Sequence, residues 1–173
     1  MNSARAALFA ALAAAFLIAA CDAGTAPATP PISPGSASSP REVHIIARDW
    51  VFLPDPVDLV PGETVLFQVV NAGLDIHEVV IGNAAVQDAW EEAEAAVAEH
   101  PPGPTPAVSV PPDVAGLRAV VASGERVDVL WTVPMDAGGT GSAEALVIGC
   151  HIPGHWAKGM VVPIRIVRPS PAP

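Results

Sequence analysis

The sequence predicts an all-β domain, a sandwich or small barrel of about eight short strands, with one inserted helix. Three observations support this prediction. From residue 41 onward, short runs of β-branched and apolar residues alternate with Pro, Gly and Asn turn signals. One segment replaces this rhythm with an apolar stripe at helical spacing. Residues 21–40 show neither pattern, so the domain is expected to span 41–169, with a short tail at 170–173.

Nine runs carry the strand signal. In chain order they are 43–47, 50–53, 57–60, 64–70, 77–81, 118–122, 126–133, 144–150 and 160–167. Prolines and glycines, such as Pro61-Gly62 and Ser123-Gly124, separate them as turn residues do. The spacing of these runs therefore favours a β-sandwich or barrel over a fold with alternating helices.

An amphipathic helix of about fourteen residues is expected within 84–100. Its apolar stripe at three- and four-residue spacing consists of Val86, Trp90, Ala93 and Val97. Asn83 is placed to cap the helix, and Pro101-Pro102 to end it. The six prolines of 101–116 predict an irregular connector, so 84–116 forms an insertion. The acids of this helix favour a solvated face, with docking of a basic redox partner as the alternative.

The first twenty residues are typical of an export signal. Arg5 precedes an apolar, Ala-rich run that is too short for a stable membrane span. The run ends in Ala19-Ala20-Cys21, which resembles the lipobox of bacterial lipoprotein precursors. This resemblance implies a signal peptide at 1–20 and a lipid on Cys21. An ordinary signal cut near Ala20, leaving Cys21 as a spare thiol, is the alternative.

The segment 21–40 is rich in Ala, Thr, Ser and Pro and lacks apolar periodicity. Such a composition cannot bury enough surface to fold, so a semi-extended tether is expected. Together with the lipidation signal, the tether predicts an exported protein that is lipid-anchored to a bacterial membrane and faces the periplasm or the cell exterior. The formal charge of −10 disfavours nucleic acid as a partner.

A metal site is predicted around the second cysteine, Cys150. If Cys21 carries lipid, Cys150 has no disulfide partner, and a bound metal would protect its thiol in an oxidising compartment. Cys150 begins the pattern Cys150-x4-His155-x4-Met160 on a loop that contains Pro153-Gly154. With His77 from another apolar run, the set is two imidazoles, a thiolate and a thioether, as in a blue-copper site. A buried structural thiol is the alternative for Cys150.

Three segments resemble the cupredoxin family, which includes plastocyanin, azurin and auracyanin. The stretch 47–54 resembles the first strands of the family, and 61–77 resembles the segment that ends in its first histidine ligand. Cys150-x4-His155-x4-Met160 resembles its copper loop. The resemblance covers 43–167, apart from the insertion, and implies a Greek-key β-sandwich. It also implies one mononuclear copper, Cu(I)/Cu(II), bound by Nδ1 of His77 and His155, by Cys150, and at longer range by Met160.

Two residues that follow predicted ligands, Glu78 and His151, are not part of the predicted ligand set. Glu78 stands where family members often have an asparagine that ties the two ligand segments together. This departure bears on the reduction potential, which depends on the groups around the ligands. His151 is expected to point to the opposite side of an extended chain from Cys150, and no role is assigned to it.

The predicted site favours single-electron transfer over catalysis, because four ligands leave no open coordination position. The implied partners are a redox donor and acceptor, such as a cytochrome or a membrane oxidase or reductase, and the membrane through the lipid anchor. The chain is expected to be a monomer. The resemblance implies that the edge of the His155 ring is the electron port and that an apolar patch surrounds it. The residues expected in this patch are Leu74, Ile152, Pro153 and Trp156. The alternative is an extracytoplasmic copper-binding protein for copper tolerance, buffering or delivery, although the chain has no Met-rich or His-rich tract.

Overall fold

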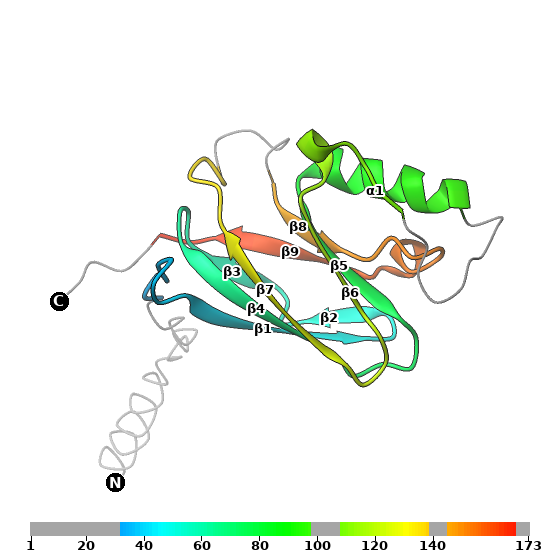
Figure 1. Cartoon of the computed structure of the whole chain (residues 1–173), viewed down its shortest axis with the longest axis horizontal. Coiled ribbons are helices and arrows are strands. Elements are labelled where there is room, and N and C mark those ends of the chain that lie inside the picture. The colour runs from blue at the N-terminus through cyan, green and yellow to red at the C-terminus, as the bar shows by residue number, and fades with distance from the viewer. Residues whose placement is uncertain (1–31, 98–107, 139–144, 169–173) are drawn as a thin grey trace, which may run out of the picture. The chain divides into compact units, whose positions relative to one another are not determined.

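The computed structural model describes residues 32–97, 108–138 and 145–168. The predicted signal peptide, the lipidation site Cys21, most of the predicted tether and the 170–173 tail lie outside these ranges. No helix in the described part of the chain is long and apolar enough to cross a membrane. The described residues form two β-sheets and one α-helix (Figure 1).

The two sheets confirm the predicted β-sandwich. The first has the strand order β2-β1-β4-β7 and consists of β1 (Arg41–Arg48), β2 (Val51–Leu53), β4 (Thr64–Asn71) and β7 (Arg126–Thr132). The second has the order β3-β9-β8-β5-β6 and consists of β3 (Val57–Leu59), β5 (His77–Gly82), β6 (Leu117–Val121), β8 (Val147–Gly149) and β9 (Val161–Ile166). The pairs β1–β4 and β3–β9 are parallel, and the other neighbours are antiparallel.

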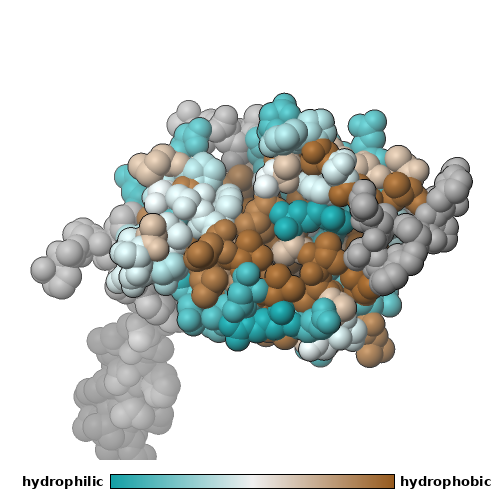
Figure 2. All heavy atoms as spheres, viewed as in Figure 1, coloured by the Kyte–Doolittle hydropathy of each residue, from teal (hydrophilic) through white to brown (hydrophobic). Residues whose placement is uncertain are grey.

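The core lies between the sheets because alternate residues of each strand face inward. Val43, Ile45 and Ala47 of β1 are buried, while the residues between them are exposed. In β7 the apolar side chains are only half-buried or, at Leu130, exposed, because β7 is an edge strand. Figure 2 shows apolar side chains across the middle of the face on which β6 and β7 lie.

Strand β5 is buried along its whole length because it is covered on both faces. Val79 and Ile81 belong to the core between the sheets. On the outer face Val80 packs against Val86 and Trp90 of helix α1 (Ala84–Val97). Helix α1 has the predicted length, and Asn83 Oδ1 accepts the Val86 N–H at 3.2 Å, as an N-cap does. Helix α1 therefore forms a third layer over the strand that begins with His77 (Figure 1).

Several predicted strands are longer than the observed ones, and two of them differ at the candidate metal centre. The run 144–150 contains only the three residues of β8, and the chain leaves the sheet at Cys150, whose N–H donates to the Met160 carbonyl at 3.1 Å. Strand β2 begins at Val51, after the turn that contains Trp50. In both cases the ladder ends at a residue that lies at the candidate metal centre.

The contacts of the domain begin before residue 41. The carbonyl of Gly35 accepts the N–H of Thr64 at 3.1 Å, and the N–H of Gly35 donates to Glu63 at 3.3 Å. The same buried carboxylate accepts two bonds from Arg41 and the N–H of Val60. Glu63 thus fixes the entry of the chain into β1.

Candidate metal centre

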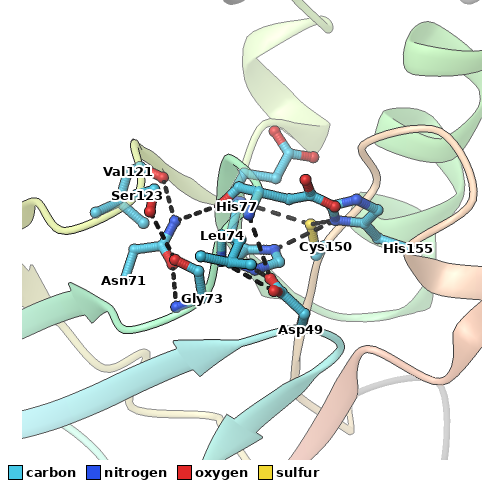
Figure 3. A network of polar contacts seen from close by, with 11 residues as sticks. Asp49, Asn71, Gly73, Leu74, His77, Val121, Ser123, Cys150 and His155 are labelled. Atoms are coloured by element: carbon cyan, nitrogen blue, oxygen red, sulfur yellow. Dashed lines mark hydrogen bonds and ion pairs between the residues drawn. The ribbon is translucent and has the colours of Figure 1, made fainter.

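Three predicted ligands meet at one end of the sandwich (Figure 3). His77 begins β5, Cys150 follows β8, and His155 precedes the short 3-10 helix η3 (Trp156–Lys158). One ligand atom from each lies within 4.8 Å of the other two. The Nδ1 atom of His155 lies 3.3 Å from Nδ1 of His77 and 3.2 Å from Sγ of Cys150. The donors therefore converge on a single point.

The imidazole of His77 is oriented by a carboxylate from the β1–β2 turn. Nε2 of His77 lies 2.7 Å from Oδ1 of Asp49. Because an ionised carboxylate only accepts, Nε2 carries the proton and Nδ1 keeps its lone pair for a metal. The Leu74 N–H, and after it the His77 ring, bond to Asp49 and lower the pKa of its carboxyl group. The carboxylate is thus held ionised beside a candidate metal ligand.

The loop before His77 is fixed by the buried side chain of Asn71 (Figure 3). Its amide nitrogen donates to the carbonyl oxygens of Asp75 and Val121, at 2.7 and 3.0 Å. Its Oδ1 accepts the Gly73 N–H at 2.8 Å. These bonds tie the loop to the end of β6.

Gly73 allows Asp49 to reach the ring of His77. A Cβ added at this position would overlap Oδ1 of Asp49 and would lie 2.9 Å from Nε2 of His77. Real Cβ atoms do not approach polar atoms so closely, so one of the two groups would have to move. The close approach of backbone and side chain here requires glycine.

The thiol of Cys150 is buried at the centre. Burial raises its pKa to about 12, although the Glu78 N–H, 3.5 Å from Sγ, opposes the shift. Only the thiolate ligates metals, so a cation at this point supplies what the thiol needs to lose its proton. Burial, together with the nearby His77, lowers the pKa of His155 and favours the neutral ring that a metal requires.

Met160 is fully buried, and its backbone is bonded to Cys150 and to His155. Its carbonyl accepts the Cys150 N–H, and its N–H donates to the carbonyl of His155 at 3.2 Å. The loop is therefore closed between the residues predicted as ligands. The role of the Met160 thioether as an axial ligand stays a prediction.

Trp50 covers the two histidine rings. Its ring centroid lies 4.7 Å from that of His155 and 6.2 Å from that of His77. The Nζ of Lys158 lies 3.3 Å from the same ring, within the range of a cation–π contact. Trp50 is packed against the core at the edge where the candidate ligands lie.

Two residues next to the candidate ligands contribute to the site: Glu78, which sequence analysis singled out, and His151, to which it assigned no role. Glu78 Oε1 accepts the His151 N–H at 2.9 Å, so the glutamate ties the two ligand segments together despite replacing asparagine. The His151 ring points away from Cys150, as predicted, but it is buried under α1. A readable signal existed: Gln87, Glu91 and Glu94 share one helix face at spacings of four and three.

The donors fit a single type 1 copper ion. Two imidazole nitrogens and a cysteine sulfur, with a thioether nearby in the chain, are the ligand set of such sites. All three grouped residues are buried, so the centre is closed, and only His155 retains measurable exposure, at 6%. A closed centre of this kind is suited to holding an ion permanently and is less suited to binding and releasing a substrate.

Comparison with known proteins agrees with this geometry. No protein-family model matches the chain. Auracyanin A, a "blue" copper protein from Chloroflexus aurantiacus, superposes with a TM-score of 0.56 at 19% identity, over 75% of this chain and 100% of that one. Azurin from Methylomonas sp. strain J superposes with a TM-score of 0.53 at 17% identity, over 74% of this chain and 98% of that one. The chain has the cupredoxin fold.

The cupredoxin fold accounts for the predicted two-sheet sandwich. At the level of sequence, the copper-resistant cuproprotein CopI of Pseudomonas aeruginosa is 25% identical over 145 residues. The match covers 73% of this chain and 76% of that protein. The similarity therefore extends over most of the cupredoxin domain of this chain.

Proposed function

We propose that this chain is a type 1 copper protein that carries single electrons between redox proteins outside the cytoplasm. The observation that carries the proposal is the closed centre of His77, Cys150 and His155. A copper ion held there, with Met160 as axial ligand, would supply a one-electron Cu(I)/Cu(II) couple. The enclosed donors leave little room for a substrate, which favours a carrier over an enzyme.

The residues of the chain hold the centre in one geometry. Asp49 keeps the proton of His77 on Nε2, and the Glu78 N–H points at the Cys150 sulfur. The donors lie at the end of a close-packed core, where movement of a side chain requires movement of its neighbours. Little rearrangement between oxidation states favours fast electron exchange.

The surface near His155 suits transient contact with another protein. His155 is the one member of the three-donor group that retains exposure, so its ring offers the shortest exit for an electron. Leu74, on the loop before His77, is 87% exposed, and Ile152 of the ligand loop is half-buried. Redox proteins of the membrane or periplasm, such as a cytochrome, are the partners we propose.

The test is the visible spectrum of the full chain after addition of Cu(II). We expect one copper per chain, an intense blue colour, and reversible loss of the colour on one-electron reduction. Cys150→Ser is expected to abolish the colour, and the matched control Cys21→Ser to retain it. A colourless Cu(II) complex of the unaltered protein contradicts the proposal.

We further propose that Cys21 carries a lipid that anchors the protein to a bacterial membrane. The motif Ala19-Ala20-Cys21 at the end of an apolar run supports this proposal. Expression with a labelled fatty acid is expected to label the protein, and Cys21→Ser to remove the label. Label retained in the Cys21→Ser variant overturns the proposal.

Copper tolerance is the second candidate function, favoured by the similarity to CopI, whose name describes a copper-resistant cuproprotein. Deletion of the gene from its host distinguishes the two candidates. A tolerance protein predicts copper sensitivity that Cys150→Ser fails to complement. A carrier predicts slower respiratory or photosynthetic electron flow at ordinary copper levels, with unchanged copper tolerance.

A further inference from the structure

Helix α1 presents polar as well as apolar side chains to the sheet that carries His77 and Cys150. Gln87 and Glu94 are only 4% and 2% exposed. Burial of polar side chains is unfavourable unless they are hydrogen-bonded. Their bonding partners therefore indicate what this face of the helix does.

The ring of His151 is held at both nitrogens by α1. Nδ1 lies 2.8 Å from Oε2 of Glu91, and Nε2 lies 2.7 Å from Oε1 of Gln87. The amide nitrogen of Gln87 is near the carbonyl oxygens of three residues, which keeps Oε1 toward the ring; these residues are Val80, Gly82 and Val147. The ring also stacks on Trp156, with centroids 4.8 Å apart. The residue next to Cys150 is thus restricted to one orientation.

A second chain of bonds joins α1 to both ligand segments. Glu78, which follows His77, accepts the His151 N–H through Oε1 and a bond from Arg118 Nε through Oε2, at 2.9 and 2.6 Å. Arg118 Nη2 donates to Oε1 of Glu94 at 2.8 Å. The guanidinium also lies over the ring of Trp90, 4.5 Å from its centroid.

Gly149 makes the contact between α1 and the ligand loop close. A Cβ at this position would lie 2.5 Å from Oε1 of Gln87 and 2.6 Å from Cζ3 of Trp156. The residue directly before Cys150 therefore has no side chain where the helix approaches. The packing of α1 against the ligand loop therefore leaves no room for a side chain at Gly149.

We propose that α1 supports the metal centre. Its residues Gln87, Glu91 and Glu94 position the Cys150 loop through His151 and Glu78. The three are positioning residues, because they act through His151 and Arg118. The inference rests on the proposed function in taking the centre to bind copper. It assigns a role to the insertion at 84–116, which the resemblance to other cupredoxins left outside.

Glu91 is the residue at which to test this, because its side chain is 51% exposed, so we expect its substitution to spare the fold. Glu91→Gln keeps the length of the side chain and an oxygen acceptor but removes the charge. Glu91→Asp keeps the charge but shortens the reach. Glu92→Ala is the matched control, since Glu92 is exposed on the same helix and has no hydrogen bond or ion pair within the described residues.

Two quantities are measured for each variant. One is the rate at which a chelator removes copper, which is monitored as the loss of the blue colour. The other is amide hydrogen exchange of residues 150–154 in the metal-free chain. Glu91→Ala removes the carboxylate altogether. In Glu91→Ala and Glu91→Asp we expect copper release to be about 10-fold faster, at the lower end of effects seen for groups that support metal ligands. We also expect faster amide exchange in these two variants. Glu91→Gln and Glu92→Ala are expected to resemble the unaltered chain.

Equal behaviour of Glu91→Ala and Glu92→Ala in both measurements overturns the inference. Equal changes in Glu91→Ala and Glu91→Gln also overturn it, because they would show an effect of charge alone. If the unaltered chain binds no copper, the proposed function fails. The exchange measurement still decides whether α1 positions the loop.

Discussion

The His77 side and the Cys150 side of the centre are supported in different ways. On the His77 side a single carboxylate, that of Asp49, bonds directly to the ligand ring, and its side chain is 26% exposed. On the Cys150 side, Arg118 of β6 bonds to Glu78, and Gln87 and Glu91 of α1 bond to His151. Glu78 and His151 are the residues that follow His77 and Cys150, and Glu78 also accepts the His151 N–H. The Asp49 contact acts directly on the His77 ring. The hydrogen bonds of Glu78 and His151 instead position the Cys150 loop. Damage to the two sides should therefore have different consequences.

The largest effect is expected from Glu78→Ala on the Cys150 side. The substitution leaves the His151 N–H without its acceptor and removes one of the two carboxylates that face Arg118. Breaking such a buried pair should lower the free energy of unfolding of the metal-free chain by about 3–5 kcal/mol, measured by denaturant titration. Glu78→Gln retains an acceptor and should cost less. A loss below about 1 kcal/mol for Glu78→Ala would show that the network contributes little.

A pH dependence of stability is expected from Glu94, also on the Cys150 side. Burial, followed by the nearby charge of Glu78, raises the pKa of Glu94 to about 7, although Arg118 opposes the shift. Between pH 4.5 and 7 the folded chain keeps a proton that the unfolded chain has released. The contribution of Glu94 to stability should therefore be greatest below this window and fall as the pH rises through it, by about 3 kcal/mol.

Glu94→Gln provides the control for this pH dependence, because glutamine does not titrate. Denaturant titrations of the metal-free chain at several pH values should show a steeper fall for the unaltered chain than for Glu94→Gln. Parallel curves for the two proteins would assign the dependence to other groups.

On the His77 side, Asp49→Asn should change metal binding and leave folding nearly unchanged. Loss of the carboxylate partner of a ligand histidine typically weakens metal binding about 10–100-fold. The reduction potential should rise, because the Asp49 carboxylate stabilises Cu(II) more than Cu(I) and the variant lacks this negative charge. Competition titration and voltammetry measure the two effects. Asp136→Asn, an exposed residue on the turn after β7, makes the same charge change away from His77 and should have neither.

The smallest effect is expected from Gly73→Ala, which displaces Asp49 without removing it. The added methyl group would occupy the space between the Asp49 carboxylate and the His77 ring. Copper affinity should fall by about 10-fold or less. In the Asp49→Asn background the same substitution should have little further effect, because both changes act on one bond. Additive losses would mean that Gly73 acts on the centre by another route.

Sequence analysis reached most of the fold because the strands and α1 carry local signals. Alternating burial in β1 and the three- to four-residue stripe of α1 both have periods that can be seen without a structure. The donor group could be predicted for a different reason. Cys150 and His155 lie close together in sequence, and their spacing is characteristic of a copper loop.

The supporting residues were harder to predict because their contacts are not local. Asp49 reaches His77 across 28 residues, and Glu91 reaches His151 across 60. The alternation rule placed the His151 ring opposite Cys150, but it could not show that α1 covers that side. The start of β2 and the end of β8 were missed because Trp50 and Cys150 continue the apolar runs of the sequence, although the chain is outside the sheet at both residues.

The wide separation of the ligand residues has a consequence for the thermodynamics of the whole chain. His77 and His155 are 78 residues apart and meet only when the sandwich has formed. An unfolded chain offers Cys150 and His155 alone as near neighbours, so an ion that requires all three donors binds the folded state selectively. Each tenfold rise in free metal above the dissociation constant then adds about 1.4 kcal/mol to the stability of the fold. The resistance of this domain to unfolding becomes a measure of the metal available around it.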